Sequence, residues 1–383
     1  MADRAEAEYC MGDRRAARGI VPNANLGGLD VSPRAKKIAF GLALACLPVV
    51  TLALVEGMAS LALLGHRLLV QPRTMEEVHT EPDTLLGWVN QRNVNRPDLY
   101  GPGIGLRTNG QRFRHVGEVA PRPPAGTRRL ICSGDSFTLG YDVGDGQAWC
   151  DRLGQTVPGL ETVNMGQGGY GVDQAYLWYL RDGIGLHPDI HIFAFIQTDF
   201  GRMMDDRFIG FPKPRLVVDG DSVRAEGIPV PRPDLGRTLI RWNAALRDLR
   251  SSQLIGHVVG GRPKATTPDP QVRATWEVAR AAFHDLVRRD SASGATLVFV
   301  LLPTIGDYRS EYRDPWRRWL GEAAARHEFT YVDLIDPLRK VPPDSVEALF
   351  VPREGRHLSV AGNIWVAEQL RRRIEPLSGS VAH

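Results

Sequence analysis

The sequence predicts an α/β fold, a three-layer sandwich in which helices cover both faces of a parallel five-stranded sheet, preceded by one transmembrane helix. From Arg128 onward, short apolar runs alternate with longer segments of helical periodicity. The runs do not alternate polar with apolar residues, which is typical of parallel strands buried on both faces. Nearer the N-terminus, the segment from Ile38 to Val55 contains no charged residue, which favours a membrane-spanning helix.

Composition limits the functions that the chain can have. The 383 residues are 43% hydrophobic and 24% charged, with a formal net charge of +3, which is typical of a globular protein. The basic residues are scattered, so nucleic acid is not an expected partner. The four cysteines show no metal-ligand spacing, and we expect neither a metal ion nor another cofactor. Cys132 lies inside a predicted strand, which favours a buried thiol over a disulfide with Cys150.

The N-terminal residues predict a membrane anchor. Residues 1–37 are polar and lack apolar periodicity, so we expect a disordered cytoplasmic tail. Residues 38–64 follow as the transmembrane helix, and the basic residues just before them place the rest of the chain outside the cytoplasm by the positive-inside tendency. A cleavable signal peptide is the alternative, but its apolar core is normally only about 7 to 15 residues long.

Residues 65–126 are rich in Asn, Pro, Gly and Arg, and we interpret them as an extended or β-rich juxtamembrane segment with a linker at its end. Asn109-Gly110, between two short runs of strand-forming residues, predicts a hairpin turn.

The main domain is expected over residues 127–377, with strands and helices in alternation. The predicted strands are Leu130–Cys132, Thr162–Asn164, Ile190–Ile196, Ala295–Leu302 and Phe329–Asp333. The predicted helices are Gln174–Arg181, Arg237–Leu254, Gln271–Arg289, Pro315–Arg326 and Val360–Arg373.

An insertion is predicted at residues 202–269, between the third and fourth strands. Within it, residues 216–224 resemble a hairpin with an Asp-Gly turn. Because the insertion leaves the carboxyl end of the third strand, we expect it to overhang Ser136 as a lid or substrate wall. A surface decoration without a role at the site is the alternative.

Polar residues and glycines follow the first three strands at their carboxyl ends, where parallel sheets hold their ligands. Gly134-Asp135-Ser136 follows the first strand, a glycine-rich turn containing Gly169 follows the second, and Gln197-Thr198-Asp199 follows the third. His357 lies in a loop before the last helix and can return to the same edge. A serine on such a turn, a histidine and glycine N–H groups are the groups that acyl transfer needs.

These blocks resemble the SGNH (GDSL-like) hydrolase family, of the membrane-anchored bacterial type, over residues 128–377. The resemblance rests on four blocks in the family's order: Gly134-Asp135-Ser136; Asn164 with Gly169 five residues later; Ile196-Gln197-Thr198-Asp199; and Glu354-Gly355-Arg356-His357. It implies a flavodoxin-like sheet, Ser136 as nucleophile, His357 as base, Glu354 as the acid behind His357, and an oxyanion hole formed by the N–H groups of Ser136 and Gly169 with Thr198.

Two positions depart from the family's pattern. Thr198 stands where the family has an asparagine, and its hydroxyl reaches less far than an amide. Glu354 replaces an aspartate, which leaves Asp333 and Asp336, at the end of the fifth strand, as alternative acids. The remaining acids of the blocks, Asp135 and Asp199, are expected to brace the loops by hydrogen bonds.

The sequence thus predicts an extracytoplasmic, membrane-anchored serine esterase. By location and resemblance, its expected substrate is an O-acetyl or other short acyl ester on a cell-envelope carbohydrate. One alternative is an O-acyltransferase of the same fold, which needs a multi-spanning partner to bring the acyl donor across the membrane. A second is a catalytically inactive glycan-binding domain.

Overall fold

The computed structural model describes residues 32–69, 74–231, 270–310, 314–352 and 356–378. The chain divides into two compact units, residues 1–65 and 66–383. The first contains most of helix α1 (Pro33–Leu69), whose residues Pro33–Leu61 are long and apolar enough to be a candidate membrane span. The predicted anchor at residues 38–64 lies within α1. The second unit contains all other described elements.

A five-stranded parallel sheet organises the second unit. Its strands are β5 (Arg128–Gly134), β6 (Leu160–Gly166), β7 (Ile190–Phe195), β12 (Thr296–Leu301) and β13 (Tyr331–Asp333). They lie in the order β13-β12-β7-β5-β6, and every neighbouring pair is parallel. The predicted sheet is confirmed, with all five strands at the expected segments. The order reverses beside β5, because β6 lies on one side of it and β7 on the other, and ligands bind at such switch points.

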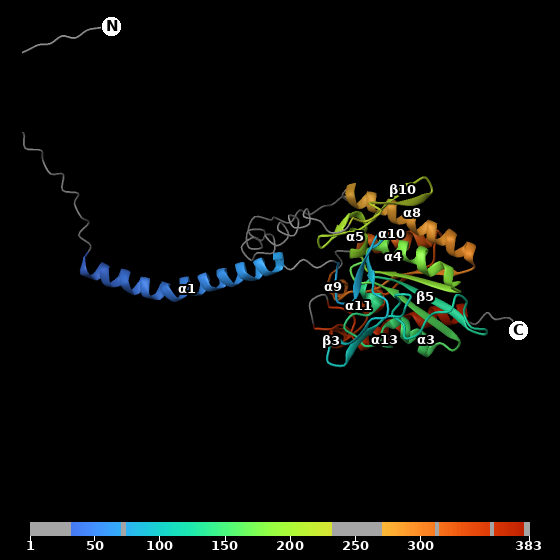
Figure 1. Cartoon of the computed structure of the whole chain (residues 1–383), viewed down its shortest axis with the longest axis horizontal. Coiled ribbons are helices and arrows are strands. Elements are labelled where there is room, and N and C mark those ends of the chain that lie inside the picture. The colour runs from blue at the N-terminus through green and yellow to red at the C-terminus, as the bar shows by residue number, and fades with distance from the viewer. Residues whose placement is uncertain (1–31, 70–73, 232–269, 311–313, 353–355, 379–383) are drawn as a thin grey trace, which may run out of the picture. The chain divides into compact units, whose positions relative to one another are not determined.

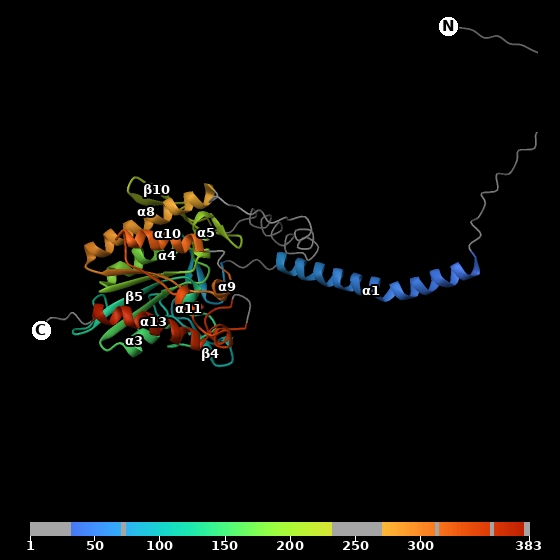
Figure 2. The same ribbon diagram turned by 180° about the vertical axis from the view of Figure 1, so that it is seen from behind.

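Helices cover both faces of the sheet, as Figures 1 and 2 show. One face carries α4 (Val172–Trp178), α5 (Thr198–Met204), α8 (Pro270–Ser293) and α10 (Asp314–Ala325). The other carries α3 (Trp149–Thr156), α11 (Ile335–Arg339) and α13 (Val360–Ser378). Because successive strand residues point to opposite faces, Leu130 packs in one core and Ile131 in the other.

Shorter helical elements complete this unit: α2 (Ser136–Leu139), α9 (Ile305–Arg309), α12 (Pro343–Val346), a π-helical turn at Tyr179–Gly183 and 3₁₀ turns at Ile184–Leu186 and Glu347–Leu349. Four of the predicted helices correspond to α4, α8, α10 and α13. The fifth, Arg237–Leu254, lies outside the described residues.

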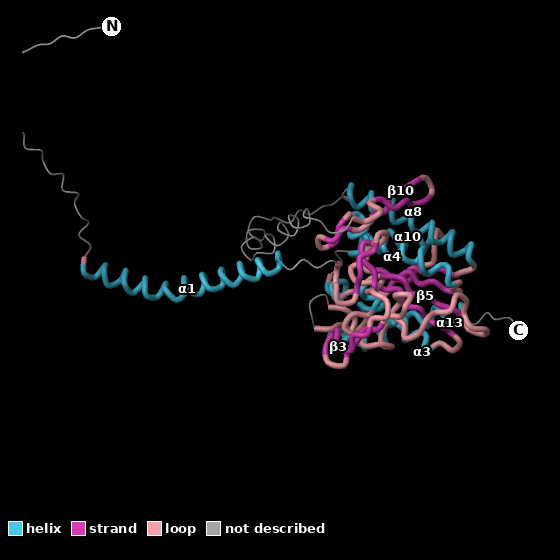
Figure 3. Tube along the Cα trace, in the orientation of Figure 1, coloured by secondary structure: helices cyan, strands magenta, loops and turns pink. Residues whose placement is uncertain are grey.

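Residues 80–107 form two antiparallel hairpins, visible among the magenta strands of Figure 3. They pair β1 (Thr80–Asp83) with β2 (Gly87–Asn90), and β3 (Asn95–Gly101) with β4 (Ile104–Arg107). The hairpin predicted at Asn109-Gly110 is wrong. The Asn109 side chain accepts hydrogen bonds from the amides of Gln111 and Phe113 at 3.0 Å, so the Asn-Gly pair forms a local side-chain turn.

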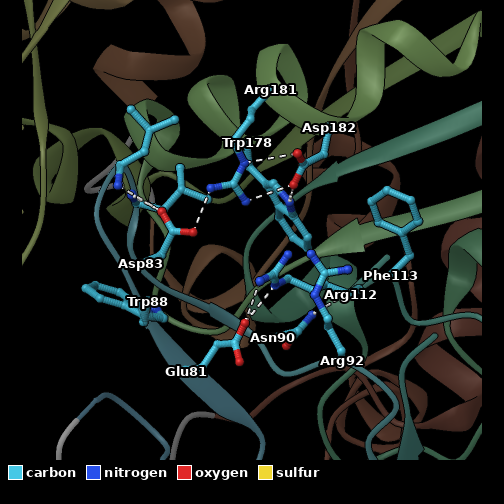
Figure 4. Close-up of polar contacts among 12 residues, drawn as sticks. Glu81, Asp83, Trp88, Asn90, Arg92, Arg112, Phe113, Trp178, Arg181 and Asp182 are labelled. Carbon is cyan, nitrogen blue, oxygen red and sulfur yellow. Dashed lines mark hydrogen bonds and ion pairs between the residues drawn. The ribbon is translucent and has the colours of Figure 1, made fainter. Parts of the chain in front are cut away.

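The hairpin segment is fastened to the α/β unit by polar contacts. Asp83 of β1 accepts a hydrogen bond from Arg181 at 2.6 Å, as Figure 4 shows. The buried Trp88 donates from Nε1 to the Gly168 carbonyl at 2.9 Å, and Tyr170 donates to the Trp88 carbonyl at 2.6 Å. The segment is therefore held directly against the glycine-rich loop that follows β6.

The described part of the insertion contains two short hairpins. β8 (Arg207–Phe208) pairs with β9 (Phe211–Pro212), and β10 (Arg215–Asp219) pairs with β11 (Ser222–Glu226) through the predicted Asp-Gly turn. Ser222 donates to Asp285 of α8 at 3.1 Å, so the β10–β11 hairpin packs on that helix. Residues 232–269 lie outside the described residues.

Cys132 and Cys150 form a disulfide, contrary to the expectation of a buried free thiol. Helix α3 packs against the sheet face to which Cys132 points, and this brings the two Cα atoms to 6.2 Å, within disulfide range. Both residues are fully buried.

Candidate active site

Ser136 lies at the sharp turn between β5 and α2. Asp135 caps the helix, and its Oδ1 accepts a hydrogen bond from the Phe137 amide at 2.9 Å. The carbonyl of Asp135 accepts from the amides of Thr138 and Leu139. This tight turn fixes Ser136 at the carboxyl end of β5, where its side chain faces the loop of the last block.

His357 reaches Ser136 from the other end of the chain. The distance between its Nε2 and the Ser136 Oγ is 2.9 Å, which is a hydrogen bond. The imidazole contacts the rings of Phe137 and Tyr141, each with its centroid 4.9 Å from that of the imidazole. Two aromatic contacts and the loop contact between Phe350 and Leu358 restrict where the ring can go. The first and fourth blocks of the sequence therefore meet.

The other ring nitrogen of His357, Nδ1, also has a carboxylate near it. Glu354 lies outside the described residues. The carboxylate that approaches the Nδ1 of His357 belongs to Asp142, whose Oδ2 lies 3.6 Å away. Sequence reasoning did not include Asp142.

The alternative acids are held elsewhere. Both Asp333 and Asp336 form ion pairs with Arg317, and the distance from its Nε to Asp333 Oδ2 is 2.7 Å. Asp333 also accepts from the Ile335 amide at 2.7 Å. These contacts anchor the end of β13 to α10.

Gly169 has a backbone conformation and surroundings that exclude a side chain. Its φ of +72° lies in the left-handed region that favours glycine. A methyl group in place of its hydrogen would meet Met75 Cε at 2.5 Å and Phe208 Cε1 at 2.7 Å. Met75 precedes β1, and Phe208 lies in β8. The segment before β1 and the β8–β9 hairpin therefore both lie over this loop.

Arg202 of α5 connects the loops that follow β5, β6 and β7. Its Nη1 lies 3.6 Å from Asp135 Oδ2, donates to the Tyr170 carbonyl at 3.0 Å and donates to Asp199 Oδ1 at 2.7 Å. These three acceptors adjoin the predicted site positions Ser136, Gly169 and Thr198. One guanidinium therefore links the three loops to one another. Thr198 itself is exposed at the first turn of α5.

The two acids around Arg202 are buried and close to each other. Burial raises the pKa of Asp135, and Arg202 opposes this effect. The pKa of Asp199 is raised well above its usual value by burial and then by the neighbouring Asp135. Asp199 also accepts from the Ile196 amide at 3.0 Å. Arg202 and the backbone N–H groups thus stabilise the carboxyl groups of Asp135 and Asp199, and these contacts connect the loops to one another.

Among the described residues, no three His, Cys, Asp or Glu side chains come close enough together to hold a metal ion.

No protein-family model matches the chain, and no curated protein matches it either. Several solved structures match the chain. A lipolytic protein of the G-D-S-L family from Desulfitobacterium hafniense is 17% identical, with a TM-score of 0.37 over 64% of this chain and 99% of that chain. The lipase/acylhydrolase from Enterococcus faecalis is 13% identical, with a TM-score of 0.35 over 65% of this chain and 96% of that chain.

An acetylxylan esterase from Geobacillus stearothermophilus, Axe2, is 15% identical, with a TM-score of 0.38 over 65% of this chain and 95% of that chain. Lipolytic proteins of the G-D-S-L family and acetylxylan esterases are thus among the solved structures that this chain resembles. The likeness is one of fold.

Proposed function

We propose that the protein is a membrane-anchored serine esterase that removes short acyl groups from a cell-envelope carbohydrate. The observation that carries this proposal is the 2.9 Å contact between the Ser136 Oγ and the His357 Nε2 at the carboxyl edge of the sheet. A hydroxyl hydrogen-bonded to an imidazole is the arrangement that generates a serine nucleophile. The contact joins two residues that are 221 positions apart in the sequence.

The chemistry runs in two steps. His357 Nε2 takes the proton of Ser136 as Oγ attacks the ester carbonyl, and the carbonyl electron pair moves to its oxygen. The tetrahedral species then breaks its bond to the leaving alcohol, which receives the proton from His357. In the second step a water molecule, activated by the same imidazole, attacks the acyl group on Ser136 and releases the free acid.

The negative oxygen of the tetrahedral species needs hydrogen-bond donors. We assign this role to the backbone N–H groups of Ser136 and Gly169, with the Thr198 hydroxyl as the third donor. The left-handed backbone at Gly169 and the Arg202 contacts that tie the loops together support this assignment. Asp135 and Asp199 brace the loops and do not touch the substrate.

The N-terminal unit and the disulfide support an extracytoplasmic location for the esterase domain. Residues 38–64 are the proposed anchor, with residues 1–37 on the cytoplasmic side and the esterase domain outside. Disulfides persist in oxidising compartments and are rare in the cytosol. The Cys132–Cys150 bond inside the sheet domain therefore supports an extracytoplasmic position.

A short acyl group fits the surroundings of the glycine loop. Met75 and Phe208 lie directly over Gly169, and the Met75 and Phe208 segments leave little space on that side of the loop. An acetyl group is among the smallest acyl groups and therefore suits this limited space.

The experiment compares hydrolysis with transfer. The full chain in detergent is incubated with an aryl acetate, with and without an unacetylated polysaccharide, and acetate release and acetylation of the polymer are both measured. We expect acetate release at the same rate with and without polymer, and none from His357→Gln. Acetyl groups appearing on the polymer would make the protein an O-acyltransferase. Binding of the polymer without turnover would make it a glycan-binding domain.

A further inference from the structure

The contact between His357 and Asp142 points to the third member of the proposed site. Asp142 Oδ2 lies 3.6 Å from Nδ1 of His357, on the side of the ring opposite the Ser136 contact. Among the described residues, Nδ1 is buried and has no hydrogen-bond partner within normal distance. An imidazole that takes a proton at Nε2 needs an acceptor at Nδ1 to hold its tautomer and to balance its charge.

The local backbone explains how Asp142 reaches that position. Helix α2 ends at Gly140, whose φ of +86° turns the chain, and Asp142 itself has a φ of +62°. Two left-handed residues so close together fold the chain back toward Ser136. Aspartate and asparagine adopt this conformation more readily than other residues with a side chain. The turn that carries the nucleophile therefore also presents a carboxylate six positions later.

Neighbouring groups favour a carboxylate at this point. The ring of Tyr141 packs against the imidazole, and its hydroxyl donates to Glu76, so this residue does not compete for Nδ1. The side chains of His357 and Asp142 are 15% and 14% exposed, which is enough shielding to strengthen an ion pair between them.

We propose that Asp142 is the positioning residue that orients His357 and stabilises its protonated form, in place of Glu354. This inference rests on the proposed function, because it assigns a partner to the same histidine. When Ser136 attacks, the proton moves from Oγ to Nε2, and Asp142 carries the compensating negative charge while its own protonation is unchanged. Nucleophile and acid then come from one short turn, and only the histidine comes from a distant part of the chain.

The test compares two carboxylate-to-amide variants in the full chain, Asp142→Asn and Glu354→Gln. Asparagine keeps the size of aspartate and tolerates the left-handed backbone. We expect Asp142→Asn to lower kcat for an aryl acetate by about 10² to 10⁴-fold with little change in KM, as expected when the histidine loses its orienting carboxylate. Glu354→Gln should stay within about 3-fold of the wild type, a small change in barrier by comparison. Asp219→Asn, an exposed acid in β10, is the matched control.

A further readout separates orientation from mere stability. The low-field proton NMR signal of the His357 Nδ1–H should disappear in Asp142→Asn and persist in Glu354→Gln.

The opposite pattern overturns the inference: a large loss of kcat and of the NMR signal in Glu354→Gln, with both retained in Asp142→Asn. The NMR signal needs no turnover. If the wild type shows no esterase activity, the proposed function fails, and the signal still decides which carboxylate holds the histidine.

Discussion

Among the described residues there are two Ser–His–Asp arrangements, and we propose that only the first of them acts on a substrate. In the first, Ser136 and His357 meet at the carboxyl edge of the sheet, with Asp142 behind the ring. In the second, inside the domain, Ser133 Oγ lies 2.9 Å from His191 Nε2, and His191 Nδ1 lies 2.7 Å from Asp290 Oδ2. The serine-to-histidine distance is 2.9 Å in both.

The surroundings of the two arrangements differ completely. Ser133 lies within β5, in register with Met165 and Phe193 of the neighbouring strands, and His191 and Asp290 are fully buried. Tyr179 stacks on His191 with ring centroids 3.6 Å apart. No substrate reaches this site. Residue types and distances alone therefore do not define a catalytic site; access and N–H donors beside the nucleophile do.

The largest expected effect separates the two serines. Ser136→Ala should lower kcat/KM for an aryl acetate by at least about 10⁴-fold, because it removes the nucleophile. Ser133→Ala should leave kcat/KM of the folded protein within about 2-fold, while stability falls by about 1 to 3 kcal/mol because the buried His191 Nε2 loses its partner. Equal losses of activity in both variants would contradict the comparison.

The second prediction concerns stability. Asp290 accepts hydrogen bonds from both His191 and Tyr179 without any contact with solvent. Asp290→Asn should lower the free energy of unfolding in urea by about 3 kcal/mol, because it disturbs two buried hydrogen bonds to a carboxylate. Asp142→Asn should lower it by less than about 1 kcal/mol, since that pair is partly exposed. A larger loss of stability in Asp142→Asn than in Asp290→Asn would contradict a structural role for the buried Ser133–His191–Asp290 arrangement.

The third prediction tests the weakest donor of the proposed oxyanion hole. Thr198→Val should reduce kcat about 10-fold, less than the usual 10² to 10³ for a buried donor, because Thr198 is exposed. Thr296→Val, another exposed threonine at the opposite end of the sheet, is the control. An unchanged kcat in Thr198→Val would remove Thr198 from the site and leave two backbone donors.

The smallest expected effect concerns Asp151, a buried carboxyl with one oxygen that has no hydrogen-bond partner among the described residues. Asp151 lines a cavity of 330 Å³ together with Arg114 and Asp145, and its Oδ2 has no hydrogen-bond partner among the described residues. Burial raises the pKa of Asp151 from 3.8 to about 6. The folded state thus holds this proton more tightly than the unfolded state, so stability falls as pH rises from about 4 to about 6.

Replacing this carboxyl removes the dependence. Asp151→Asn should be about 1 kcal/mol more stable than the wild type at pH 7.5, a gain kept small by solvent screening at the cavity wall, and equal to it at about pH 4. Urea unfolding at the two pH values measures this. A wild type that is the more stable protein at pH 7.5 would show that Asp151 is paired after all.

The sheet was predictable because its signals are local. Each strand is a short apolar run, and Gly134-Asp135-Ser136 marks the end of the first one, so the edge at which Ser136 lies follows from the rule that parallel sheets hold their ligands at the carboxyl ends of the strands. Family resemblance added the pairing with His357. The Asp-Gly turn of the β10–β11 hairpin was equally local.

The features that sequence reasoning missed depend on tertiary packing. Asp142 looks like any loop aspartate until the left-handed turns at Gly140 and Asp142 direct it toward the histidine. A position inside a strand favours a buried thiol at Cys132, yet α3 packs over that face of the sheet and brings Cys150 beside it. Asn109-Gly110 does not form a hairpin turn, because β4, the strand before it, pairs with β3.

The most direct test of the account is covalent labelling of the full chain with a fluorophosphonate, followed by mass mapping of the modified peptide. We expect one adduct, on Ser136, that is absent from Ser136→Ala and still present in Ser133→Ala. An intact wild-type protein that forms no adduct, or forms one on another residue, would contradict the assignment of Ser136 as the nucleophile.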